Sequence, residues 1–132
     1  MSNTSREIRS EVTRDGQLEL SIESVEMPTP KDHEVLLKVE ASPINPSDLG
    51  LLISFAADLS SITTEGSGDD KVTTMNILPA LHKTMAARFD KSMKVGNEGG
   101  GVVVDAGEAG KGLIGKNVGV AGGAMYSEYR CV

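Results

Sequence analysis

Residues 110–115 read Gly-Lys-Gly-Leu-Ile-Gly and match the spacing with which a glycine turn binds the pyrophosphate of a dinucleotide. That chemistry needs a helix beginning at the turn, because helix amides and the helix dipole contact the phosphates. Residues 116–120 return instead to a strand pattern, and Asn117 stands where a P-loop has Ser or Thr for magnesium. The sequence therefore predicts that this segment is a turn and binds no cofactor.

Side chains that bind metals are few in this sequence. Cys131, His33 and His82 are widely scattered, whereas a structural zinc site needs four ligands in paired spacings and a catalytic site needs three. We predict no metal site and interpret both histidines as surface residues. The single cysteine cannot form an internal disulfide, and the cytoplasm is the expected compartment.

The composition limits both the size of the protein and its partners. With 132 residues the chain has the length of one domain, 1–132, and only 3% of the residues are aromatic, so an aliphatic core is expected. A formal net charge of -6 argues against nucleic acid and against an anionic membrane surface, since both attract Lys and Arg. No apolar run approaches the ~18 residues of a membrane span, so no membrane partner is expected.

Alternating apolar residues predict strands in the first and last thirds of the chain. Leu18, Leu20 and Ile22 alternate with polar residues after a turn at 14–16, and residues 35–39 have the same period of two. Further strands are expected at 6–13, 102–104, 118–121 and 126–132.

Two short helices are expected between these strands. Pro46 suits the first turn of a helix with Asn45 as its N-cap, and Pro79 opens a second helix in which apolar residues recur every four positions from 81 to 93. Residues 60–70 are rich in Ser, Thr, Gly and Asp and are predicted to form an exposed, mobile loop. The sum predicts a mainly β (α+β) fold, a small and partly open β-barrel.

Three segments occur in an order that carries a family resemblance. Residues 34–48 place an Asn-Pro-x-Asp turn after a strand, 95–103 (VGNEGGGVV) are similar to a Gly-His-Glu-x-x-Gly signature, and 115–129 look like a closing strand-turn-strand. Together they resemble the N-terminal GroES-like catalytic domain of the medium-chain dehydrogenase/reductase family, on its zinc-independent, quinone-oxidoreductase-like branch. The resemblance implies a GroES-like barrel in which 51–94 is an insertion.

The same resemblance implies a function. Family members continue into a Rossmann domain, which is absent from this chain because it stops at Val132. Such enzymes transfer a hydride from NADPH to a quinone or an enone. We therefore expect the catalytic-domain half of an NAD(P)H-dependent quinone or enone oxidoreductase, inactive alone. Its expected partner is the missing nucleotide-binding domain, and it is expected to hold neither cofactor nor zinc by itself.

The candidate catalytic residues also come from the resemblance: Asn45, Asp48, Asn97 and Tyr126. Zinc-dependent relatives have Cys where Asn45 stands and His where Asn97 stands, and an amide is a poor zinc ligand. Asn45 is the candidate cofactor-binding residue, because its amide suits the nicotinamide carboxamide or a carbonyl oxygen. Structural alternatives stay open: a helix N-cap for Asn45, hydrogen bonding within the fold for Asp48 and Glu98, and packing for Tyr126.

Two other functions stay open. The GroES-like barrel also serves as an oligomeric co-chaperonin, so a stand-alone binding or oligomerisation module is the alternative, with 60–70 as the loop that binds a partner. A catalytic domain without its partner domain is expected to expose an apolar patch, which favours a homodimer or aggregation.

Overall fold

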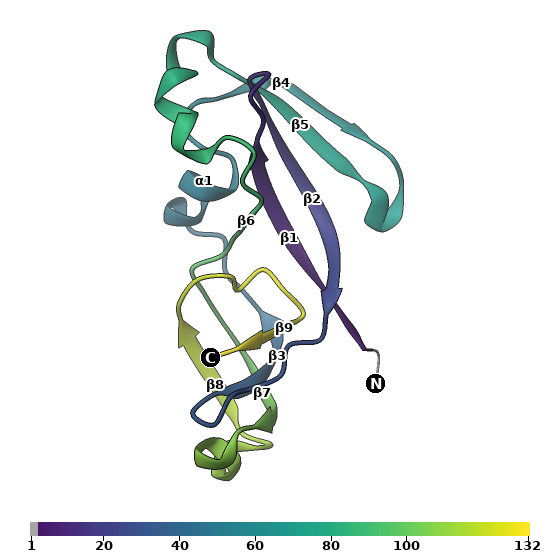
Figure 1. Cartoon of the computed structure of the whole chain (residues 1–132), viewed down its shortest axis with the longest axis vertical. Coiled ribbons are helices and arrows are strands. Elements are labelled where there is room, and N and C mark those ends of the chain that lie inside the picture. The colour runs from purple at the N-terminus through teal and green to yellow at the C-terminus, as the bar shows by residue number, and fades with distance from the viewer. Residues whose placement is uncertain (1–2) are drawn as a thin grey trace. The chain divides into compact units, whose positions relative to one another are not determined.

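The computed structural model describes residues 3–132, which form mostly β-strands, one α-helix and short 3₁₀ helices (Figure 1). The strands are β1 (Thr4–Val12), β2 (Gln17–Glu26), β3 (Val35–Ala41), β4 (Ala57–Glu65), β5 (Val72–Ile77), β6 (Met93–Lys94), β7 (Glu98–Ala106), β8 (Asn117–Ala121) and β9 (Tyr129–Cys131). The helix α1 covers Pro46–Leu52, and the 3₁₀ helices cover Gly68–Asp70, Pro79–Leu81, Lys83–Arg88 and Glu108–Leu113. The predicted fold class is confirmed: the chain is mainly β, with two antiparallel sheets that are not closed into a barrel.

Contacts divide the chain into two compact units. The first contains the residues up to Glu7 together with Ser24–Ile44 and Gly96–Val132, and the second contains Ile8–Glu23 and Asn45–Val95. The segment 51–94, expected to be an insertion, lies wholly within the second unit. Within residues 3–132, no helix has the length and apolar character needed to cross a bilayer.

The first unit is built on a four-stranded sheet with the order β8-β7-β3-β9. Its core residues are at most 8% exposed and comprise Val35, Leu36, Leu37, Val103 and Met125. Three consecutive residues of β3 are buried, although strict alternation would turn Leu36 away from Leu37. β3 is an inner strand between β7 and β9, and both of its faces are covered over these three residues.

The second unit contains most of a five-stranded sheet with the order β4-β5-β2-β1-β6. Its buried cluster consists of Val12, Leu18, Ala56, Met75, Ile77 and Met85. As the composition predicts, this cluster is aliphatic, and it includes Met75 and Met85. Of the alternating apolar residues of β2, Leu18 is fully buried, whereas Ile22 is 38% exposed. The apolar face of β2 is therefore less buried toward Ile22 than at Leu18.

Residues 60–70 are exposed except for the half-buried Ser61, but the prediction of a loop is wrong for most of them. β4 continues through this segment and pairs antiparallel with β5, and the hydroxyls of Thr64 and Thr73 share a hydrogen bond of 2.9 Å. The chain turns only after the strand, where Gly66 has φ of +85° and a Cβ would lie 2.5 Å from the carbonyl oxygen of Asp70. The hairpin has no buried face along this stretch, so its sequence lacks the alternation by which strands are recognised.

The prediction of a single α-helix at 79–93 is wrong. The chain forms two 3₁₀ helices, Pro79–Leu81 and Lys83–Arg88, and then turns at Asp90, which has a positive φ of 56°. The N–H of Asp90 donates to the carbonyl oxygen of Val12 at 2.8 Å. A hydrogen bond to β1 therefore takes the place of further helix.

The turn predicted at 110–115 is present only in part, because residues 110–113 belong to a 3₁₀ helix and the turn follows at 114–115. The 3₁₀ helix Glu108–Leu113 ends before Gly115, which has φ of +84° and whose N–H donates to the carbonyl oxygen of Val103 at 2.8 Å. A Cβ on Gly110 would lie 2.7 Å from a methyl group of Val35. These glycines therefore serve the turn and the packing against β3, and the chain goes directly into β8.

Candidate functional site

Asn45 and Asp48 lie together at the start of α1, in the second unit. Pro46 occupies the first helical position, and Asn45 has the extended backbone of an N-cap, with φ −98° and ψ 159°. The Oδ2 atom of Asp48 accepts a hydrogen bond of 2.7 Å from the backbone N–H of Asn45, and the two residues form a capping box. The predicted N-cap is confirmed, and Asp48, which is 1% exposed, makes a structural hydrogen bond. Their catalytic roles stay predictions.

Tyr126 lies in the first unit, packed against Gly96. Its hydroxyl donates a hydrogen bond of 2.9 Å to the carbonyl oxygen of Pro43, and its side chain is half-buried. Gly96 has φ of +94°, and a Cβ there would lie 2.7 Å from the Cδ1 atom of the ring. Glycine is therefore required for the ring to lie in this position. The contact fixes both the ring and the hydroxyl of this candidate residue.

A second hydrogen bond joins the same two segments of the first unit. The Ser42 Oγ atom donates to the carbonyl oxygen of Met125 at 2.8 Å, and a Cβ on Gly99 would lie 2.6 Å from the same Oγ atom. Sequence reasoning missed Ser42, because its partner is 83 residues away and serine is common in this chain. No local spacing marks it.

Asn97 and Glu98 stand at the start of β7, and both are exposed. The carbonyl oxygen of Asn97 accepts a hydrogen bond of 2.8 Å from the N–H of Gly122. Glu98 lines a shallow depression of about 520 Å³ together with residues 41–43 and 99–100. Asn97 also follows directly after the glycine on which Tyr126 packs.

The structure therefore groups the four candidate residues in two pairs. Asn45 and Asp48 are hydrogen-bonded in the second unit, whereas Asn97 and Tyr126 belong to the first unit, where Gly96 connects them.

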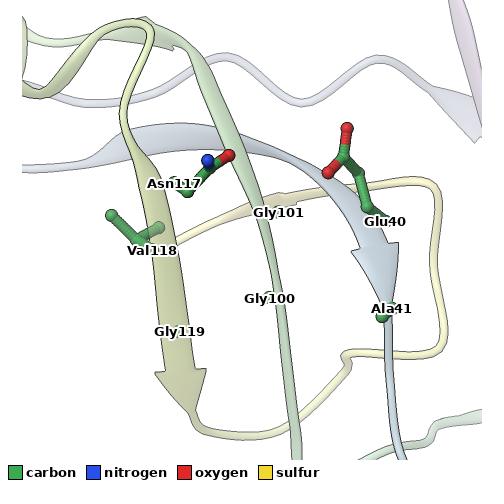
Figure 2. Close-up of a pocket in the computed structure, with 7 residues that line it drawn as sticks. All are labelled: Glu40, Ala41, Gly100, Gly101, Asn117, Val118 and Gly119. Atoms are coloured by element: carbon green, nitrogen blue, oxygen red, sulfur yellow. The ribbon is translucent and has the colours of Figure 1, made fainter.

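A neighbouring depression of about 350 Å³ lies on the face of β8, β7 and β3, and Figure 2 shows the residues that line it. Glu40 and Asn117 stand on either side of it, and Gly100 and Gly101 form its floor. A Cβ on Gly101 would collide with the carbonyl oxygen of Lys38, because β3 shifts register between Val39 and Ala41. Glycine at position 101 therefore permits the close approach of β3 and β7.

Two titratable groups of the first unit have shifted pKa values. The Arg6 side chain and its backbone N–H both donate to the Glu128 carboxylate, at 2.6 Å and 2.9 Å, and they lower the pKa of Glu128. Burial raises the pKa of the Cys131 thiol, and the charge of Glu34 adds to this effect. A thiol that stays protonated is a poor nucleophile and a poor metal ligand.

A metal centre would need several ligand side chains in one place. Over the described stretch 3–132, no group of three or more His, Cys, Asp or Glu side chains is arranged to hold a metal ion. Cys131 is half-buried on β9, and His33 is exposed. His82 is half-buried, and its ring hydrogen-bonds the carbonyl oxygen of Arg14 at 3.0 Å, so the prediction of a surface position is only partly right for it.

No protein-family model and no curated protein sequence matches the chain. A solved structure does match: a Mesorhizobium loti protein named as an NADPH:quinone reductase has a TM-score of 0.58 and 18% sequence identity to this chain. The match covers 100% of this chain and 35% of that one, so the chain spans about a third of the length of the structure it resembles. At this identity the likeness establishes the fold, and the chain has a fold found within a protein named as an NADPH:quinone reductase.

Proposed function

We propose that the chain is the catalytic-domain half of an NAD(P)H-dependent oxidoreductase that reduces quinones or enones. The observation that carries the proposal is the fold likeness, over the whole of this chain, to a protein named as an NADPH:quinone reductase. The Asn-Pro-x-Asp turn supports it, because Asn45 and Asp48 form an ordered helix start rather than an irregular loop.

The residues of this chain do not fit the pyrophosphate of a dinucleotide. The only matching glycine motif of the described residues leads from a 3₁₀ helix into β8, and no α-helix begins there to provide amides and a dipole. In this proposal NADPH is held by a separate nucleotide-binding domain, which is the required partner. When bound there, NADPH supplies the hydride for the reaction.

Asn45 is the proposed contact of this chain with the cofactor or the substrate. Its amide carries two N–H donors and one acceptor, which suits a carboxamide or the oxygen of a quinone or enone. The capping box with Asp48 fixes the backbone from which this side chain projects. Asn97 and Tyr126 are proposed as the site residues of the first unit, and no zinc takes part.

Calorimetry on the chain alone provides the first test. Titration with NADPH is expected to give no heat of binding, because the glycine motif of the described residues begins no α-helix that could bind the pyrophosphate. Fusion or co-expression with a nucleotide-binding domain of a quinone reductase should then give NADPH oxidation that depends on added quinone. Tight NADPH binding by the chain alone, or a folded fusion that binds NADPH and reduces neither quinones nor enones, would contradict the proposal.

The oligomeric state provides a second test. Exposed apolar side chains such as Ile44, at 73%, and Phe55, at 70%, favour self-association of the chain without its partner, and we propose a homodimer. Sedimentation at increasing concentration should show the dimer, and a monomer at high concentration would exclude it. A closed ring of many copies would instead favour the binding or oligomerisation module.

A further inference from the structure

The C-terminal end of α1 is held by side chains from distant parts of the second unit. The last turn of α1 contains no basic residue, although its free carbonyls and the helix dipole favour a cation there. Arg88 occupies this position: its Nη2 atom donates to the carbonyl oxygen of Leu51 at 2.9 Å and to the Oγ atom of Ser10 at 3.1 Å. The Ser10 hydroxyl in turn donates to the carbonyl oxygen of Leu52 at 2.9 Å. The last two carbonyls of α1 are thereby both hydrogen-bonded.

This arrangement is not that of an ordinary surface arginine. Ser10 is fully buried, and the Nε atom of Arg88 is a buried donor without a hydrogen-bond partner. Desolvation by burial lowers the pKa of Arg88. A desolvated guanidinium with an unsatisfied donor is costly, so the contacts that it makes to α1 and Ser10 must offset that cost.

The position of α1 depends on both of its ends. A helix of seven residues is about 10 Å long and too short to be stable without tertiary contacts. Asp48 and Asn45 close its N-terminal end, and Arg88 and Ser10 close its C-terminal end. If the C-terminal end frays or rotates, the short helix cannot keep the N-cap in place.

We infer that Arg88, acting through Ser10 and the last carbonyls of α1, is a positioning residue for Asn45. The catalytic meaning of this inference rests on the proposed function, because Asn45 is the proposed contact with cofactor or substrate. The coupling between Arg88 and Asn45 is a property of the second unit and is measured without any reaction.

Amide hydrogen exchange on the chain measures this coupling directly. The N–H of Asn45, which donates to Asp48, reports on the N-terminal end, and the N–H of Ile53, which donates to Leu49, reports on the C-terminal end. Arg88→Met should accelerate the exchange of both amides by ~10-fold or more, while the amides of β2 and β5 keep their rates.

Arg14→Met is the matched control. Arg14 lies in the same unit and is paired with Asp90 at 2.6 Å, but its side chain is 76% exposed. This variant should leave the exchange of Asn45 and Ile53 unchanged. Ser10→Ala should repeat the pattern of Arg88→Met with a smaller amplitude, and it decides the question if Arg88→Met does not fold.

Three results would overturn the inference. The first is faster exchange at Ile53 with no change at Asn45, which would make Arg88 an anchor of the C-terminal end only. The second is equal acceleration in α1, β2 and β5, which would indicate loss of overall stability. The third is no change in α1 at all.

The fused enzyme gives an independent measurement. Arg88→Met should lower kcat by ~10-fold with little change in KM for NADPH, since the partner domain binds the pyrophosphate and Asn45 contacts at most the nicotinamide end. Arg88→Lys should restore part of kcat because it keeps the charge. A full kcat in Arg88→Met would contradict the inference. A fusion of the unchanged chain that shows no reaction would instead count against the proposed function, and the exchange measurement would still decide the coupling.

Discussion

The hydroxyl of Tyr126 donates to the carbonyl oxygen of Pro43 across 2.9 Å and so joins the segment before β9 to the end of β3. The bond lies within the first unit, and Ser42 and Met125 add a second hydrogen bond beside it. A residue selected as a candidate for catalysis therefore has a structural contact of its own.

Removal of this hydroxyl should cost stability. Tyr126→Phe is expected to lower the free energy of unfolding by about 0.5–1.5 kcal/mol, because the Pro43 carbonyl loses its donor while the ring keeps its packing on Gly96. Urea unfolding measures the change. Tyr129→Phe, a half-buried tyrosine of β9, is the control and should leave the midpoint in place. Equal midpoints for the two variants would show that the Tyr126 bond contributes nothing.

Gly101 should not tolerate a side chain. In Gly101→Ala the new Cβ would collide with the carbonyl oxygen of Lys38 and lie 3.0 Å from the backbone nitrogen of Glu40, so a loss of about 1–3 kcal/mol in unfolding free energy is expected. Gly119→Ala on the adjacent strand β8 is the control, since a Cβ there meets nothing within 4 Å, and it should change stability by less than about 0.5 kcal/mol. Thermal unfolding compares the two, and similar losses would refute the steric argument.

Asn45 has two roles that one substitution separates. Asp is as good an N-cap as Asn, so Asn45→Asp should keep the unfolding free energy within about 0.5 kcal/mol, but it removes the N–H donors of the side chain. In the fused enzyme its rate of NADPH oxidation should fall by ~10-fold or more. Asn45→Ala loses both roles, with a cost of about 1 kcal/mol in stability. If Asn45→Asp keeps full activity, Asn45 is only an N-cap.

The ion pair of Arg6 and Glu128 predicts a dependence of stability on pH. The pKa of Glu128 is lowered in the folded chain, so the folded state binds fewer protons than the unfolded state as the pH falls. The contribution is complete above the ordinary pKa of 4.5 and is lost as the pH falls through the lowered value. Because both side chains are substantially exposed, at 51% and 42%, the contribution should be well under 1 kcal/mol.

A double-mutant cycle measures this contribution. Arg6→Gln, Glu128→Gln and the double variant should each flatten the acid limb of the curve of unfolding free energy against pH, and the double variant should add little to either single one. Additive effects of the two single substitutions would show that the pair does not interact.

Short-range patterns predicted several elements correctly. Pro46 and Asn45 indicated the start of α1, and the alternation at 35–39 indicated β3. The glycines of 110–115 and the strand pattern after them indicated the turn before β8, which the structure has at 114–115 after a 3₁₀ helix. These elements are predictable because they depend on the φ of proline, the freedom of glycine and hydrogen bonds between residues a few positions apart.

Other elements formed against the local pattern. The apolar spacing at 79–93 is typical of a helix, yet the backbone N–H of Asp90 donates to the carbonyl oxygen of Val12 in β1. The polar composition at 60–65 is typical of a loop, yet this stretch belongs to β4, which pairs with β5. The first conformation depends on a strand far away in the sequence. The second is a local hairpin, and it was missed because neither strand has a buried face along this stretch and the sequence therefore lacks alternation.

The sequence by itself determined the fold class, the aliphatic core and the N-cap at Asn45. Tertiary structure decided which donors reach α1 and the end of β3: Arg88 bonds Leu51 from 37 residues away, and Tyr126 bonds Pro43 from 83 residues away. The physical reason is that a polar side chain bonds whichever group packing brings within about 3 Å, and packing is a property of the whole unit rather than of any local stretch.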